Sequence, residues 1–75
     1  MNNQRRKRIS VALDHIRAAC SILEDVLQQE RDALENWPEN LQGSERYYLT
    51  EDAADLLDEI LSDLQETCRK ANDLP

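Results

Sequence analysis

The sequence predicts an all-α protein, an antiparallel hairpin of two helices that associates with a second copy into a four-helix bundle. Two long segments, about residues 6–35 and 45–71, repeat apolar residues every three or four positions and contain neither proline nor glycine. The connector between them, residues 36–44, holds the only glycine and the only internal proline. At 75 residues the chain is one domain, and residues 1–5 are expected to be a frayed basic tail.

The first segment has the alternating spacing of a heptad pattern. Its apolar row is Ile9, Leu13, Ile16, Cys20, Leu23, Leu27 and Leu34. A neighbouring row of mostly small residues, namely Ala12, Ala19, Val26 and Ala33, widens this stripe. Glu30 interrupts the first row, and we expect it to be solvated at the end of the bundle or paired with a base such as Arg46.

The second segment carries a similarly broad stripe. Its apolar row is Ala53, Leu57, Ile60, Leu64, Thr67, Ala71 and Leu74, with Ala54, Leu61 and Cys68 alongside and Leu56 as a further position. Arg69 and Lys70 fall in the last turn, where positive charge suits the helix dipole. Glu66 lies four residues before Lys70, which is the spacing of a favourable ion pair.

Each stripe is wider than a contact between two helices requires. A chain this small has a poor surface-to-volume ratio, so its stability is expected to come from association. We therefore predict a homodimer. The predicted self-association seam is Leu13, Ile16, Cys20, Leu23, Leu27, Leu57, Ile60 and Leu64. The alternative is a monomeric hairpin packed on an unrelated host protein.

Pro38 and Gly43 define the connector. Proline lacks an N–H and clashes with the preceding turn, so the first helix should end near Asn36. Gly43 accepts a positive φ, which suits a chain reversal. Ser44 then offers its hydroxyl as the N-cap of the second helix, with Thr50 as the alternative cap.

The connector also offers a candidate partner surface. Trp37 and Leu41 are the apolar residues expected to anchor the loop on the end of the bundle. The residues of this surface are Trp37, Pro38, Glu39, Asn40, Leu41, Tyr47 and Tyr48. The simpler alternative is a turn that only joins two helices.

The connector resembles the turn of a known group of small proteins. Its sequence is Asn36-Trp37-Pro38-Glu39-Asn40-Leu41-Gln42-Gly43-Ser44-Glu45-Arg46. This run is similar to the signature (D/E)-N-x-P-E-N-L-Q-x-S-E-R of small helical-hairpin proteins of bacteriophages and integrative elements. The function of that family is unassigned, so the resemblance implies an architecture and a mobile-element origin but no catalytic residue. Trp37 departs from the pattern, which more often has Ile, Met or Leu there.

Cys20 and Cys68 are the only cysteines. If the helices are level on either side of the connector, facing residue numbers sum to about 80, so Cys20 lies opposite Ile60 and Cys68 opposite Ala12. The sulfur atoms are then on the order of 12 Å apart, too far for a disulfide bond within one hairpin. Both cysteines are expected to be reduced core residues. The chain has no further Cys and a single His, so a zinc site is not expected.

Charge is distributed unevenly along the chain, whose net charge is -7. Residues 1–19 hold five of its basic side chains. In an antiparallel hairpin the basic end, away from the connector, gathers Arg5, Arg6, Lys7, Arg8, Arg69 and Lys70. These side chains could hold the phosphates of a nucleic acid, but no stacking aromatic or groove-reading motif accompanies them.

The end that carries the connector is acidic instead. Its carboxylates are Glu35, Glu39, Glu45, Glu51 and Asp52. Two hairpins in a dimer are therefore expected to run antiparallel, with the basic end of one beside the acidic end of the other.

The second helix carries many carboxylates, namely Glu51, Asp52, Asp55, Asp58, Glu59, Asp63 and Glu66. All-α nucleotide pyrophosphatases hold Mg²⁺ with acidic residues at such three- and four-residue spacing. Here, however, the carboxylates alternate with the apolar stripe and point outward. We therefore expect no enzyme activity, no catalytic residue, no metal and no cofactor. An outward acidic row either keeps the bundle soluble or imitates a nucleic-acid backbone.

Together these features predict a small non-enzymatic interaction protein of a phage or mobile element, acting as a helical oligomer. The alternatives are an acidic, DNA-mimicking anti-defence inhibitor of a host nucleic-acid-binding enzyme, and weak nucleic-acid binding through the basic end. No apolar run is long enough to span a bilayer, and no signal-peptide pattern is present. We therefore expect no membrane association and a place in the host cell cytosol.

Overall fold

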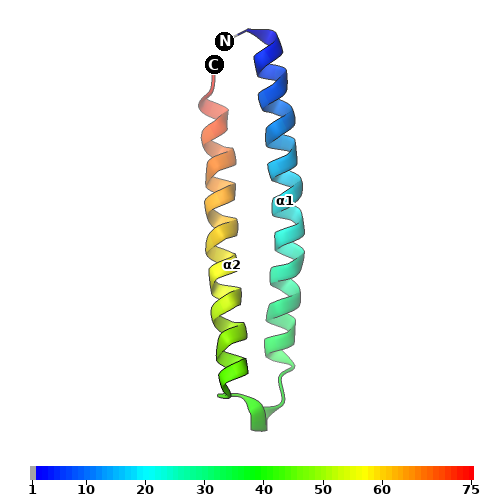
Figure 1. Cartoon of the computed structure of the whole chain (residues 1–75), viewed down its shortest axis with the longest axis vertical. Helices are drawn as coiled ribbons and strands as arrows, with labels where there is room; N and C mark the ends of the chain where they lie inside the picture. Colours follow the sequence, from blue (N-terminus) through cyan, green and yellow to red (C-terminus); the bar gives the residue numbers. More distant parts are fainter. Residues whose placement is uncertain (1) are drawn as a thin grey trace.

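A computed structural model describes residues 2–75, which form two long helices packed side by side (Figure 1). Helix α1 spans Asn3–Glu35 and helix α2 spans Glu45–Lys70. Two short 3₁₀ turns complete the chain, η1 at Glu39–Leu41 in the connector and η2 at Ala71–Asp73 after α2. The molecule is a rod of 60 × 15 × 13 Å with both termini at one end. The predicted all-α antiparallel hairpin is confirmed.

Helix α1 begins earlier than expected. The side chain of Asn2 accepts a hydrogen bond from the backbone N–H of Arg5 at 2.8 Å and thereby caps the first turn. The tail predicted at residues 1–5 is thus helical from Asn3 onward, while Met1 lies outside the described residues. The four adjacent basic residues oppose the helix dipole at about 0.3–1 kcal/mol each when poorly screened, and the Asn2 cap offsets part of this cost.

The two ends of the connector follow the sequence rules. Helix α1 stops at Glu35, three residues before Pro38. The Ser44 side chain accepts from the Tyr47 N–H at 3.2 Å, so it is the N-cap of α2 as predicted. Thr50 lies inside α2, where its hydroxyl donates to the Arg46 carbonyl at 2.9 Å.

The core is a single layer of side chains between the helices. Among residues 2–75, four apolar residues are buried, Cys20 and Leu27 on α1 and Ala54 and Leu61 on α2. Packed against them, and partly buried, are Ile16, Leu23, Leu34, Leu57 and Leu64. No side chain among residues 2–75 is less than 2% exposed, so even the centre of the layer reaches solvent.

On α2 the buried row differs from the predicted one. Ile60 is 43% exposed, whereas its neighbour Leu61 is 5% exposed and buried. The predicted row and the observed row both repeat every three or four residues, and they have Leu57 and Leu64 in common. The row that packs is centred on Ala54 and Leu61, which are seven residues apart and therefore almost in line along the helix.

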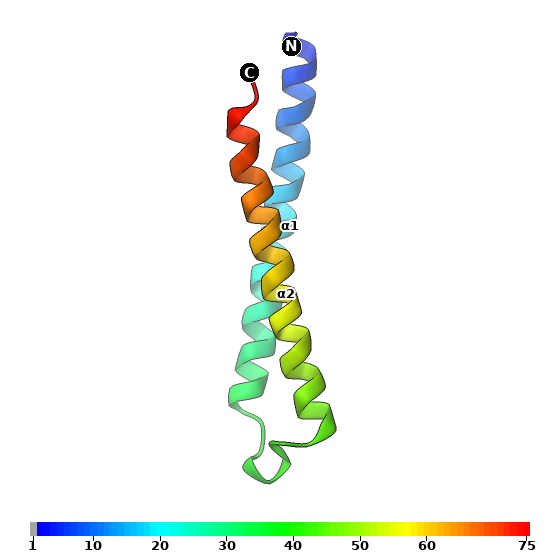
Figure 2. The same cartoon turned by 90° about the vertical axis from the view of Figure 1, so that its left-hand side faces the viewer.

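The predicted register between the helices is wrong. It placed Glu24 level with Leu56, but the Glu24 carboxylate accepts a hydrogen bond from Gln65 at 2.9 Å. Two causes combine. Helix α2 begins closer to the tip of the connector than α1 ends (Figure 2). In addition, side chains lean toward the N-terminus of their own helix, so antiparallel partners meet beyond their level positions.

Gly43 adopts φ +90° and is the one residue of the described chain with positive φ. A Cβ added there would meet nothing closer than the Tyr48 hydroxyl at 3.6 Å, so the cost of a side chain is in the backbone alone. We predict that Gly43→Ala lowers the free energy of unfolding by about 1–2 kcal/mol. Urea titration followed by circular dichroism measures it. Gly43→Asn is the control, because Asn tolerates this region better, and an equal loss in both variants contradicts the explanation.

Candidate interaction surfaces

Large apolar side chains remain exposed along the hairpin. Tyr48 on α2 is one of them. The aliphatic ones are Val11, Ile22 and Val26 on α1 and Leu49, Leu56 and Ile60 on α2. Ile22 is 64% exposed and Leu49 is 62% exposed, which leaves both outside the contact between the helices. We call these aliphatic residues, except Val11, the outer apolar face.

Five of the six aliphatic residues lie on one side of the hairpin, whereas Val11, nine residues and thus about a half-turn around the helix from the buried Cys20, points away from α2. The polar contacts between the helices, Gln65 to Glu24 at 2.9 Å and Arg31 to Asp58 at 2.8 Å, define the opposite side. Leu56 and Ile60 are each two residues from Asp58. Two residues turn a helix by about 200°, so these side chains point away from the polar contacts.

Helix α1 follows the same rule. Ile22 and Val26 are each two residues from Glu24, so they point away from its contact with Gln65. The exposed alanines Ala19, Ala33 and Ala53 lie on this side as well, where their small size permits close approach. The hairpin thus has one polar side, which the inter-helix contacts occupy, and one apolar side.

The structure divides the predicted seam residues between two places. Seven of them lie buried or half-buried in the contact between α1 and α2, namely Leu13, Ile16, Cys20, Leu23, Leu27, Leu57 and Leu64. Ile60 alone lies on the outer apolar face. Val11, Ile22 and Leu49 lie outside the apolar rows predicted from the sequence. Their signal is a four-residue step from Ile22 to Val26 and a seven-residue step from Leu49 to Leu56.

The connector brings three aromatic rings together. Trp37 packs edge-on against Tyr47 with ring centroids 5.7 Å apart, and Tyr47 meets Tyr48 at 5.9 Å. The predicted anchoring role holds for Trp37, which is half-buried, but not for Leu41, which is 49% exposed. Leu41 lies in the η1 turn, and the nearby Pro38, Glu39 and Asn40 are exposed too.

One polar atom in this cluster has no partner. The Nε1 of Trp37 is buried and makes no hydrogen bond. A buried N–H without an acceptor costs free energy, so the tryptophan is held by the packing of its ring and not by its polar edge.

The basic end is only partly free. Arg5, Arg6, Lys7 and Arg8 are exposed, and none of them takes part in an ion pair within residues 2–75. A groove of about 260 Å³ lies at this end between α1 and the C-terminal residues, with Arg6, Ile9, Leu13, Leu74 and Pro75 among its walls.

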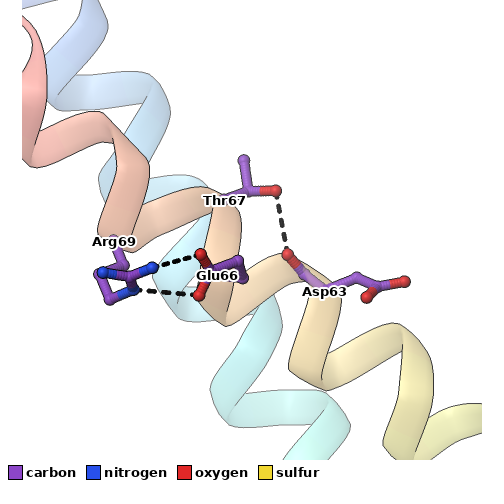
Figure 3. Close-up of polar contacts among 4 residues, drawn as sticks. All are labelled: Asp63, Glu66, Thr67 and Arg69. Atoms are coloured by element: carbon purple, nitrogen blue, oxygen red, sulfur yellow. Dashed lines mark hydrogen bonds and ion pairs between the residues drawn. The ribbon is translucent and has the colours of Figure 1, made fainter.

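Arg69 is engaged by its own helix. Its guanidinium donates two hydrogen bonds to the Glu66 carboxylate (Figure 3), so the expected Glu66–Lys70 pair is replaced by a pair three residues apart. These hydrogen bonds lower the pKa of Glu66 below its usual value. Thr67 donates its hydroxyl to the backbone carbonyl of Asp63. Thr67 was predicted in the apolar row of α2, but it is exposed and does not extend the buried layer.

The carboxylates of α2 lie mainly at the surface. Asp52, Asp55, Glu59 and Asp63 are exposed. Asp58 is half-buried and pairs with Arg31. In the part of the chain that the structure describes, no three acidic, His or Cys side chains gather as metal ligands would. Glu30, expected to be solvated at the end of the bundle or paired with a base such as Arg46, is half-buried and has no ion pair within residues 2–75.

Across residues 2–75, neither helix has an apolar stretch of the length that crossing a bilayer requires. Comparison with known proteins adds no relative, because no family model, no curated protein and no solved structure matches the chain.

The unpartnered Nε1 of Trp37 gives a test of the connector. We predict that Trp37→Phe changes the free energy of unfolding by less than about 0.5 kcal/mol, because it keeps the ring edge on Tyr47 and removes the orphan N–H. Trp37→Ala removes the ring and should cost about 2 kcal/mol. Thermal unfolding followed by circular dichroism measures both. A large loss in the phenylalanine variant would show that Nε1 is satisfied after all.

Proposed function

We propose that this protein is a small interaction protein without catalytic activity, which acts as a homodimeric four-helix bundle of a phage or mobile element in the host cytosol. The observation that carries the proposal is the outer apolar face. Five large apolar side chains lie on one side of a hairpin whose own helix contact leaves them exposed. Such a row normally meets a partner.

The exposed area of the chain is large enough for an interface with a second copy. A compact monomer of 8.7 kDa exposes about 4,700 Å² of surface, whereas this chain exposes 5979 Å². The excess, about 1,300 Å², exceeds the roughly 800 Å² that each partner buries in a standard interface. A second copy seated on the outer apolar face would cover it.

The symmetry of a homodimer suits this face. In a two-fold dimer the same surface of each copy meets its counterpart. Ile22, Val26, Leu56 and Ile60 would then form a layer between the hairpins, and the alanines beside them would admit the facing helix. Four helices around one core is the usual solution for such stripes.

Charge favours one orientation of the two copies. The free basic side chains of residues 5–8 lie at one end of a 60 Å rod, and the acidic connector lies at the other. A parallel dimer would place like charges together at both ends. An antiparallel dimer places opposite charges together, so charge selects the orientation while the apolar face supplies the affinity.

The origin and the lack of catalysis have separate support. The turn sequence around Pro38 resembles that of small phage and integrative-element hairpins. The carboxylates of α2 point into solvent singly or in ion pairs, without the convergence that a Mg²⁺ site needs.

A second candidate rests on those same carboxylates. Exposed acidic side chains follow α2 from Asp52 to Glu66, and few of them are paired. A row of this kind could occupy the phosphate-binding surface of a host enzyme that acts on DNA. Competition between the protein and duplex DNA for such an enzyme, repeated with the exposed acids changed to amides, would test this role.

The dimer is tested by adding one negative charge to either side of the same helix. We predict that Ile22→Asp, which places a carboxylate on the outer apolar face of each copy, raises the dissociation constant about 100-fold or more. Ser21→Asp is the matched control, because it adds the same charge one residue away on an exposed polar surface. It should change the constant by less than about twofold. Sedimentation equilibrium measures both.

A third variant shows what loss of folding looks like, in contrast to loss of association alone. Leu57→Asp puts the carboxylate into the contact between α1 and α2. It should abolish helical circular dichroism together with association, because an unpaired buried carboxylate costs several kcal/mol, comparable to the stability of a small domain. The proposed dimer is wrong if Ile22→Asp sediments like the parent protein.

The orientation is tested at the basic end. We predict that Arg5/Arg6/Lys7/Arg8→Ser weakens association about 10-fold or more at low salt and reduces its salt dependence, since exposed pairs contribute up to about 1 kcal/mol each. Dissociation constants at low and high salt measure it. Unchanged association at low salt rejects the antiparallel pairing. Loss of binding to nucleic acid in the same variant would then assign the basic end to phosphate.

A further inference from the structure

The two cysteines lie together on the polar side of the hairpin. Cys20 on α1 and Cys68 on α2 line one groove, with Arg17, Ser21, Glu24 and Gln65 as its other walls. Glu24 and Gln65 are themselves in contact at 2.9 Å across the helices. The register expected from the sequence separated these cysteines by two helical turns, so their proximity is a finding of the structure.

The two thiols differ in access to solvent. Cys20 is 7% exposed and belongs to the core layer, whereas Cys68 is half-buried near the end of α2. Both are free. Burial, then the nearby Cys68 and Glu24, raise the pKa of the Cys20 thiol. Because Cys68 is the more accessible of the two thiols, it is the one that an oxidant meets first.

We propose that Cys20 and Cys68 form an oxidation site that closes to an intrachain disulfide bond between α1 and α2 when the protein meets a hydroperoxide. The placement of the two thiols on one groove, from opposite helices, carries this inference. It is independent of the proposed dimer.

The chemistry needs only the peroxide and the two thiols. The Cys68 sulfur attacks one peroxide oxygen, the O–O bond breaks, and the products are a sulfenic acid and one water. The Cys20 sulfur then attacks the sulfenic sulfur, and the hydroxyl leaves with the Cys20 proton as a second water. Two thiols are oxidised by two electrons, and one hydrogen peroxide is reduced to two waters.

The bond would join the helices without disturbing the outer apolar face. Its groove shares Glu24 and Gln65 with the polar side, from which Ile22 and Ile60 point away. It would close a loop of about 50 residues, so it would restrict the unfolded chain strongly. Oxidation would thus stiffen each hairpin and fix the register of its helices while leaving the surface for a second copy unchanged.

Intact mass of the full chain under denaturing, non-reducing conditions tests the site. The reduced protein is treated with hydrogen peroxide, and remaining thiols are alkylated. We expect a monomer lighter by two hydrogens that resists alkylation, with one peptide pair joining Cys20 to Cys68. At fixed protein concentration the thermal midpoint should rise by about 10 °C or more. Dithiothreitol should reverse both changes.

Two single variants are the controls. Cys68→Ser and Cys20→Ala should each lose the mass change and the rise in midpoint, with circular dichroism confirming that they fold. In Cys20→Ala the oxidised Cys68 should be trapped by dimedone as a sulfenic acid. A covalent dimer through Cys68, a sulfinic acid at Cys68 with Cys20 still alkylated, or a crosslinked monomer with a lower midpoint would each overturn the proposal.

Discussion

Two helices that touch along a single line can shield only the side chains between them from water. In this chain the line of contact runs through Cys20, Leu27, Ala54 and Leu61, and even these residues retain some exposure. The radius of gyration is 17.4 Å, against about 11 Å for a compact chain of this length. The shape and the exposed face follow from this limit, because the sequence supplies more apolar surface than one contact can cover.

The polar residues complement this arrangement. The contacts Arg31–Asp58 and Gln65–Glu24 cross the helices on one side only. Their groups are exposed, so each contributes little stability. They lie on the side opposite Ile22, Val26, Leu56 and Ile60, so the apolar side carries neither of these two polar contacts. A hairpin with polar contacts on both sides would have no continuous face to offer a partner.

Local rules predict the elements of this chain well. Pro38, Gly43 and Ser44 act through their own backbone or side chain, so the connector and the start of α2 could be placed from the sequence. Helix α1 begins earlier than the sequence predicted because Asn2 caps its first turn despite the basic residues that follow. These features depend on neighbours within a few residues.

Properties that depend on packing were harder to predict. Leu57 belongs to two rows with the same spacing, and only contact with α1 decides that Leu61 is buried and Ile60 exposed. The register depends on the path of the connector and on the lean of side chains, neither of which periodicity reveals. An error in the register separated Cys20 from Cys68 and concealed the groove that they share.

The position of the single tryptophan gives the molecule a built-in optical probe. Trp37 lies beside Tyr47 at the connector, at the opposite end of the rod from the termini. Its fluorescence, including energy received from the neighbouring tyrosines, reports the opening of that end alone. Circular dichroism reports both helices along their length. In a rod this long and thinly packed, the two signals separate fraying of the ends from cooperative melting of the whole.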